Sequence, residues 1–467
     1  MRLDKSTLLM KLLPALTGVL ACLCLGHWLL AGGQTHGFVP RLPNADRGAN
    51  AAATPVARLA GTLEHFGGVP ATLPGAWPSF RGPHGDNICT DAVPLARSWP
   101  ESGPPARWTL ALGEGYAGAA VFNGRVYVLD YDQPRQQDAL RCFSLADGQE
   151  IWRHSYRVRI KRNHGMSRTV PAVTAKSVVT MGPLCHVVCV DAGTGVYRWG
   201  IDLVRDYGAT VPPWYAGQCP VIDNERAILA PAGSSVLLMA VDCATGLVLW
   251  KTPNPHAWTM THSSVLPITF HGRRMYVYCG SGGVVGVAAD TGAILWETSD
   301  WKVDIANVPT PVVVGEGELL LSGGYNAGSM LLRLREKAGR IVVAHDFRLP
   351  AETFGSDQQT PIFYQGSLYA VVADGRLVCL DLQGKPRWNS GTHRFGLGAY
   401  LVADGMIYVL NDSGTLTLVA ATPTGYQQLA EAKVLAGHDA WGPMALVNGR
   451  LLARDLTTMV CLDVARH

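Results

Sequence analysis

A short unit recurs five times along this chain. Each copy is an apolar run, then a turn rich in Asp, Thr and Gly, then a tryptophan four residues after the last turn glycine. The glycine and tryptophan pairs are Gly148 and Trp152, Gly195 and Trp199, Gly246 and Trp250, Gly292 and Trp296, and Gly384 and Trp388. A period of about 46 residues matches one four-stranded propeller blade. The repeat therefore predicts an all-β propeller.

The composition agrees with an all-β chain that has many tight turns. The 467 residues include 52 Gly and 29 Pro without collagen periodicity, and only 16% of the residues are charged. The formal net charge is +3, and aromatic residues do not interleave with runs of Lys or Arg. We therefore expect no nucleic-acid partner.

The strands that end each unit predict eight blades. Five carry the repeated tryptophan, and copies without it lie near residues 341–347 and 427–435. Trp108 marks an eighth outer strand, which precedes every inner strand, whereas the chain ends on inner strands at residues 449–453 and 459–463. Pairing these two ends would hide both open edges. We therefore predict that the Trp108 strand completes the C-terminal blade and closes the ring.

The blade tryptophans are interpreted as structural residues. Each can cap the interface between neighbouring blades and bury a large apolar area. The set is Trp108, Trp152, Trp199, Trp250, Trp296 and Trp388.

Four cysteines also recur at one position of the unit. They are too far apart to be bridged, and we expect them to be small buried apolar residues. They are Cys142, Cys189, Cys379 and Cys461.

Residues 1–33 predict a signal anchor or a signal peptide. Residues 12–31 are apolar apart from His27, and a basic flank precedes them. This length spans a bilayer, and the flank predicts a cytoplasmic N-terminus with the rest exported. We favour an uncleaved anchor in the inner membrane. Cleavage near residues 31–33 and a lipoprotein with acceptor Cys22 are the alternatives. Residues 34–76, rich in Ala, Gly and Pro, predict a flexible linker, and residues 77–467 form the predicted propeller.

The loops that enter the innermost strands should surround the mouth of the central channel. Their polar and aromatic residues are the candidate ligand-binding set: His164, Arg168, Tyr215, His262, Asn307, Gln359, Tyr400 and Trp441. Such side chains gathered from many blades could form a binding funnel. Alternatively, they bond to one another and to channel water and hold the ring together. We expect no metal, because no spacing joins His164 and His262 to a third ligand.

No catalytic residue is predicted. Residues 233–236 form a glycine-rich hairpin pattern and not the strand-to-helix elbow of a hydrolase. The glycine-rich stretch 322–328 is not followed by a helical pattern, so it lacks the helix N-terminus that a phosphate site requires.

The blades resemble the pyrroloquinoline-quinone (PQQ) repeat of quinoprotein alcohol dehydrogenase-like propellers. Residues 77–85, Trp-Pro-Ser-Phe-Arg-Gly-Pro-His-Gly, are similar to the opening of an exported bacterial branch that resembles the outer-membrane β-barrel assembly lipoprotein. The resemblance runs from Trp77 to Asp463. It implies a periplasmic or other extracytoplasmic propeller that binds a protein or a cell-envelope component.

The resemblance also implies a rival function. Quinoprotein dehydrogenases hold PQQ against two adjacent disulfide-linked cysteines, with calcium bound by Glu, Asn and Asp. This chain has no adjacent cysteines, and it shows no ordered set of the about six to eight oxygen ligands that calcium takes. We therefore expect a non-catalytic, membrane-tethered scaffold without a cofactor. The alternatives are a divergent oxidoreductase that uses PQQ and Ca²⁺, and a sensor of a small molecule or glycan.

Overall fold

The computed structural model describes residues 14, 16–27 and 56–466, in two units, residues 1–54 and 55–467. In the first unit, residues 16–27 are helical. Within the described residues, no helix is both long and apolar enough to cross a membrane. The remainder of the predicted segment 12–31, and linker residues 34–55, lie outside the described residues. An anchor or signal peptide at this end therefore stays a prediction.

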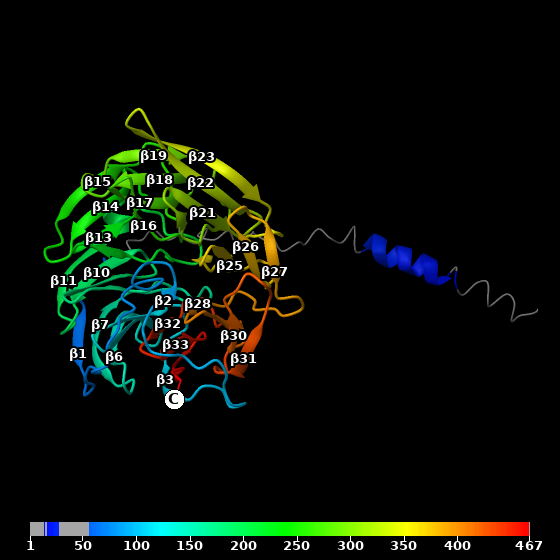
Figure 1. Ribbon diagram of the computed structural model, residues 1–467, viewed down its shortest axis with the longest axis horizontal. Coiled ribbons are helices and arrows are strands. Elements are labelled where there is room, and N and C mark those ends of the chain that lie inside the picture. The colour runs from blue at the N-terminus through cyan, green and yellow to red at the C-terminus, as the bar shows by residue number, and fades with distance from the viewer. Residues whose placement is uncertain (1–13, 15, 28–55, 467) are drawn as a thin grey trace, which may run out of the picture. The chain divides into compact units, whose positions relative to one another are not determined.

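The second unit is built from eight sheets arranged around a common centre (Figure 1). The first blade contains β4 (Ala119–Phe122), β5 (Arg125–Asp132), β6 (Gln137–Ser144) and β7 (Glu150–Arg157). The second contains β8 (Ala172–Val173), β9 (Ser177–Met181), β10 (His186–Asp191) and β11 (Tyr197–Asp202). The third contains β12 (Val221–Asp223), β13 (Arg226–Leu229), β14 (Val236–Asp242) and β15 (Val248–Pro253). The fourth contains β16 (Leu266–Phe270), β17 (Arg273–Gly280), β18 (Gly283–Ala288) and β19 (Ile294–Thr298).

The other four blades repeat this order from the centre outward. The fifth contains β20 (Val312–Gly315), β21 (Glu318–Gly323), β22 (Gly328–Lys337) and β23 (Arg340–Leu349). The sixth contains β24 (Ile362–Tyr364), β25 (Ser367–Val371), β26 (Leu377–Asp381) and β27 (Pro386–Asn389). The seventh contains β28 (Tyr400–Ala403), β29 (Met406–Leu410), β30 (Thr415–Ala420) and β31 (Gln428–Lys433). The eighth contains β32 (Ala445–Val447), β33 (Arg450–Arg454), β34 (Thr458–Asp463) and, from the start of the propeller, β3 (Ala106–Ala111). The short helix α2 (Leu203–Tyr207) follows the second blade.

The eight-bladed propeller with four-stranded blades is confirmed, and local turn chemistry explains much of it. At Asn123 and Gly124 φ is 48° and 69°, and at Asp404 and Gly405 it is 48° and 70°. Two consecutive residues with positive φ give a hairpin turn whose twist matches that of the flanking strands. The same pattern recurs at residues 448 and 449, whereas at the predicted turn 374–375 only the glycine has positive φ.

Strand β3 pairs with β34, and Trp108 lies opposite Cys461. The predicted pairing of the Trp108 strand with the C-terminal blade is therefore present. In Figure 1 the cyan β3 lies beside the red C-terminal strands. Closure of the whole ring by this pairing stays a prediction. Contacts at the seam between the eighth and first blades allow it to be tested.

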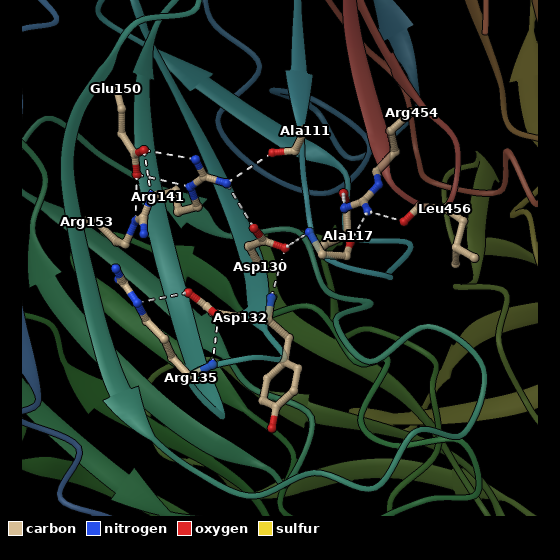
Figure 2. Close-up of polar contacts among 12 residues, drawn as sticks. Ala111, Ala117, Asp130, Asp132, Arg135, Arg141, Glu150, Arg153, Arg454 and Leu456 are labelled. Carbon is tan, nitrogen blue, oxygen red and sulfur yellow. Dashed lines mark hydrogen bonds and ion pairs between the residues drawn. The ribbon is translucent and has the colours of Figure 1, made fainter. Parts of the chain in front are cut away.

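A buried arginine lies at this seam. Arg454 of β33 is 1% exposed and donates to the main-chain oxygens of Ala117, at 3.1 Å, and Leu456, at 2.9 Å. The chain that joins β3 to β4 is also held from the first blade, because Asp130 of β5 accepts from the Gly113 N–H at 2.8 Å. Figure 2 shows these contacts, together with the Arg141 guanidinium that donates to Asp130 at 3.0 Å. Polar groups of both blades thus fix one connecting segment.

The blade tryptophans pack mostly on the following blade. Trp199 donates its indole N–H to the Cys243 oxygen at 2.9 Å, and Trp250 donates to the Ala289 oxygen at 3.1 Å. Trp388 makes the equivalent bond to Thr422, at 2.7 Å. Trp296 differs, because its N–H points to the Met275 sulfur, 3.4 Å away in its own blade.

The recurring turn glycines receive these rings. A Cβ placed on Gly195 would lie 2.6 Å from the Trp152 ring, and one on Gly246 would lie 2.7 Å from Trp199. Gly292 is related to Trp250 in the same way, at 2.5 Å. In these three turns the glycine is therefore needed for its positive φ and for the space that the tryptophan of the preceding blade fills.

The propeller unit begins earlier than the sequence predicts. Strand β1 (Thr62–His65) falls in the predicted linker, yet it pairs with β7 as a fifth strand of the first blade. Strand β2 (Ile88–Cys89) pairs in parallel with β28. Both pairings add main-chain hydrogen bonds at an open strand edge, which local composition does not reveal. The four recurring cysteines are buried and unpaired, as predicted.

Candidate binding cavity at the channel mouth

A cavity of about 270 Å³ lies where the chain enters the innermost strands. Every blade contributes to its lining except the seventh, which is built on β28. The lining residues are Phe80, Tyr116, His164, Arg168, Trp214, Gly217, Cys219, His262, Ala306, Val308, Tyr325, Gln358, Gln359, Trp441 and Pro443. The lining is therefore aromatic and polar, and it contains no carboxylate.

The structure brings five of the eight candidate residues together in this cavity. They are His164, Arg168, His262, Gln359 and Trp441. Each comes from a loop that precedes the first strand of its blade, as the sequence predicts. Gln359 is fixed by its side-chain N–H groups, which donate to the Leu397 oxygen at 3.3 Å and to the Trp441 oxygen at 3.1 Å.

Three candidates do not line the cavity. Tyr215 has a φ of 77°, is 7% exposed and donates its hydroxyl to the Lys161 oxygen. Asn307 is 3% exposed, and its main-chain oxygen accepts from the His262 N–H at 3.0 Å. Tyr400 begins β28 and is buried in an apolar cluster. The positive φ of Tyr215 and the strand position of Tyr400 direct these two side chains away from the channel.

Two aromatic rings in contact, tilted against each other, form one wall. The Tyr116 and Trp441 ring centroids are 5.1 Å apart with an interplanar angle of 33°. The Trp441 indole N–H donates to Asp412 at 2.7 Å, and the Tyr116 hydroxyl accepts from the Gly165 N–H at 3.3 Å. The wall is therefore held in place before any ligand arrives. An offset pair of this kind offers a flat apolar surface.

Arg168 supplies the positive charge of the cavity. Its guanidinium carbon lies 4.9 Å from the centre of the Tyr116 ring, within the range of a cation–π contact. Its Nε donates to the Trp214 oxygen at 2.5 Å, whereas its buried Nη2 has no hydrogen-bond partner among the described residues. Burial lowers the pKa of Arg168 to about 10, so the side chain remains charged at neutral pH.

His262 has the opposite character. Burial, with the nearby Arg168 charge, lowers the pKa of His262 to about 4. Its imidazole is therefore neutral at pH 7, with its one N–H directed to the Pro213 main chain and the other ring nitrogen left as an acceptor. Gly217 lies directly against it, because a Cβ at that position would be 2.7 Å from its Nδ1.

A segment that the sequence did not place in the site forms the floor. Residues 77–89 cross from β4, where the Trp77 N–H donates to the Val121 oxygen at 2.8 Å, to β28, where the Asn87 side chain donates to the Tyr400 oxygen at 2.5 Å. Between them, Arg81 donates to the Pro361 oxygen at 3.0 Å. Phe80 of this segment lines the mouth cavity and also a second hollow of about 370 Å³. Its ring therefore separates the two.

Sequence reasoning missed several lining residues. Tyr116 and Trp214 lie in loops that enter innermost strands, but the candidate set took Tyr215 from the second loop and no residue from the first. Tyr325 lies between β21 and β22, and no repeat signal marks it. Phe80 carries a signal in its motif, residues 77–85, which precede the first strand of the ring.

The lining does not fit PQQ held on calcium. Calcium takes about six to eight oxygen ligands, usually including carboxylates. No carboxylate lines the cavity. In the part of the chain that the structure describes, no group of three His, Cys, Asp or Glu side chains could hold a metal ion.

Comparisons with known proteins agree with this architecture. The family model described as outer membrane protein assembly factor BamB matches residues 135–344. The blades in this range therefore match a PQQ-repeat family model, and solved PQQ-type propellers share the fold of the chain. The resemblance of its blades to PQQ repeats is thereby confirmed. A comparison with curated proteins found no match.

Solved propellers share the fold at low sequence identity. BamB from Moraxella catarrhalis is 15% identical, with a TM-score of 0.53 over 76% of this chain and 98% of that one. A europium-containing methanol dehydrogenase is 12% identical, with a TM-score of 0.61 over 81% and 89%. Quinohemoprotein alcohol dehydrogenase from Comamonas testosteroni is 13% identical, with a TM-score of 0.58 over 84% and 81%. Because both binding proteins and enzymes share it, the fold alone does not assign an activity.

Proposed function

We propose that this PQQ-repeat propeller is a non-catalytic, exported scaffold that binds a protein or another cell-envelope component at the channel mouth. The carboxylate-free cavity carries the proposal. Its paired Tyr116 and Trp441 rings and its charged Arg168 form an anchor site. Aromatic residues and arginine are the side chains that most often dominate the energy of protein interfaces.

The likeness to BamB supports this choice over the dehydrogenases. The family model that matches is that of an assembly factor, and the cavity lacks the oxygen ligands that a quinone-bound calcium needs. A divergent quinoprotein oxidoreductase is the second candidate because two of the similar structures are alcohol dehydrogenases. A sensor of a small molecule or glycan is the third.

The proposed location is the periplasm or another extracytoplasmic space, with the chain tethered to the cytoplasmic membrane. The apolar stretch of residues 12–31 and its basic N-terminal flank support this location. A BamB-like propeller is consistent with work in the cell envelope.

Two measurements on the full chain test the proposal. Affinity capture from envelope extract should recover a discrete protein partner, and addition of PQQ and Ca²⁺ with an artificial electron acceptor should give no turnover of alcohols or sugars. Turnover would establish the oxidoreductase. Capture without any protein partner, together with saturable binding of a metabolite or glycan, would favour the sensor.

A further inference from the structure

We propose that the mouth cavity binds the C-terminus of a partner polypeptide, with the terminal carboxylate on Arg168 and the last side chain, an apolar or aromatic one, against Tyr116 and Trp441. This inference rests on the proposed function and names the part of the partner that the site takes. It follows from the charge of the cavity, its aromatic wall and its small volume.

The charge of the lining favours an anion. Arg168 lines the cavity and is charged at neutral pH. Its buried Nη2 has no hydrogen-bond partner among the described residues. An unpaired buried donor is costly, and a carboxylate oxygen would satisfy it with a charge-assisted bond. A positively charged ligand would meet Arg168 with no acidic residue in the lining to offset the repulsion.

The aromatic wall favours an apolar group beside that carboxylate. The Tyr116 ring lies between the two functions, since one contact places it 5.1 Å from the Trp441 ring and another 4.9 Å from the Arg168 guanidinium carbon. A ligand bound at Arg168 therefore lies beside the aromatic pair. A terminal residue presents a carboxylate and a side chain on one Cα atom, which matches this close spacing.

The floor favours a chain end over a chain that passes through. Phe80 closes the cavity on the side of residues 77–89, and that segment is fixed to both β4 and β28. A volume of about 270 Å³ is at the small end of ligand pockets. A cavity of this size has room for about one residue beside Arg168.

The polar groups are already in position, which lowers the entropy lost on binding. Trp214 fixes Arg168 through its main-chain oxygen, and Asp412 fixes Trp441 through its side chain. The aromatic wall and the Arg168 Nε are thus held in place, and only the end of the guanidinium has to turn for Nη2 to meet a carboxylate.

The test uses fluorescence-labelled peptides and the full chain. The probe is a short N-acetylated peptide that ends in phenylalanine with a free carboxylate. The same peptide with a C-terminal amide and the small acid 3-phenylpropanoate are the comparison ligands. The free-carboxylate peptide should bind at least about tenfold more tightly than the amide, as expected when one charge-assisted bond is lost. Equal binding of the two peptides, or no binding of either, would overturn the proposal. Tight binding of 3-phenylpropanoate without the peptide would show that the site takes a free acid and would overturn the peptide assignment.

Variants locate the binding. Arg168→Gln should abolish the preference for the free carboxylate, and Arg168→Lys should keep part of it because the charge remains. Arg162→Gln is the matched control, since it removes an equal charge from a 59% exposed side chain paired with Glu114. Thermal unfolding confirms that each variant folds. If Arg168→Gln and Arg168→Lys both recover the partner from envelope extract as well as the unaltered chain does, the scaffold function stands and this inference fails.

Discussion

Trp108 of the eighth blade donates its indole N–H to the main-chain oxygen of Leu145 in the first blade, at 3.0 Å. The bond joins the eighth blade to the first, although the two residues are only 37 positions apart in the chain. It has the same form as the Trp199 bond to Cys243 and the Trp250 bond to Ala289 between consecutive blades. The seam therefore uses the contact that joins other neighbouring blades, which supports the prediction that β3 closes the ring.

Gly148→Ala tests the seam. Its Cβ would lie 2.9 Å from the Trp108 ring, and its φ is 71°. Gly405 has an almost equal φ of 70° but open space around its Cβ, so Gly405→Ala reports the backbone cost alone. We expect Gly405→Ala to lower the free energy of unfolding by about 1 kcal/mol and Gly148→Ala to lower it by roughly 2–4 kcal/mol. Urea titration measures both, and equal losses would mean that the Trp108 packing contributes little.

Replacing Arg454 should be strongly destabilising. Arg454→Met would leave the Ala117 and Leu456 oxygens without their donor in the buried seam. We expect the free energy of unfolding to fall by roughly 3 kcal/mol or more. Arg387→Met is the control, because Arg387 is half-exposed in its 3.0 Å pair with Asp381 and should cost less than about 1 kcal/mol. A loss for Arg454→Met no larger than that of the control would contradict the assigned role.

Asp138 should make stability depend on pH. Burial raises the pKa of Asp138 to about 7, against the opposing effect of the Tyr156 hydroxyl that donates to it at 2.7 Å. In the unfolded chain the carboxyl titrates near its ordinary value of about 3.9. Between about pH 4 and 7 the unfolded state thus binds fewer protons, so the contribution of this group to stability is full below pH 4 and is lost as pH rises towards 7.

Asp138→Asn isolates this effect. The wild-type chain should lose roughly 2–3 kcal/mol relative to the variant between pH 5 and pH 7, because each unit of pH corresponds to about 1.4 kcal/mol per proton. Denaturant midpoints at the two pH values measure the difference. Parallel curves for the two proteins would show that the buried carboxyl does not titrate in this range.

Gly217→Ala tests the cavity without removing a charged group. The new methyl group would lie 2.7 Å from the His262 Nδ1 and should displace that ring into the cavity. We expect recovery of the partner to fall roughly tenfold, the size of one lost good contact. Gly425→Ala is the control, since nothing lies within 4 Å of its Cβ. Undiminished recovery with Gly217→Ala would place partner binding elsewhere on the propeller.

The blades could be predicted from the sequence because their signals are local and repeated. Asn123 and Gly124 specify a hairpin by their own φ preference, and each glycine and tryptophan pair marks one outer strand. The pairing of β3 with β34 could also be inferred, because each end of the array has an unpaired strand edge and this pairing covers both. By contrast, β1 and β2 lie in segments without a sustained apolar pattern, and long-range edge pairing forms them.

The site was partly predictable for a related reason. The loops of His164, His262 and Trp441 reach the mouth because every blade starts there. Which side chain of a loop faces the channel depends on local backbone angles, such as the φ of 77° at Tyr215. The sequence pattern does not encode those angles. Phe80 was missed because the segment that crosses from β4 to β28 has no counterpart in the repeat.

A photo-reactive amino acid placed at His164 gives the most direct test of the scaffold claim. His164 is exposed and lines the mouth cavity, whereas His84 is exposed on the segment 77–89 and lines the second hollow. Irradiation of cells that carry the full chain should give a discrete protein adduct from position 164 and none from position 84. Adducts from position 84 alone, or from neither position, would contradict a partner-binding mouth.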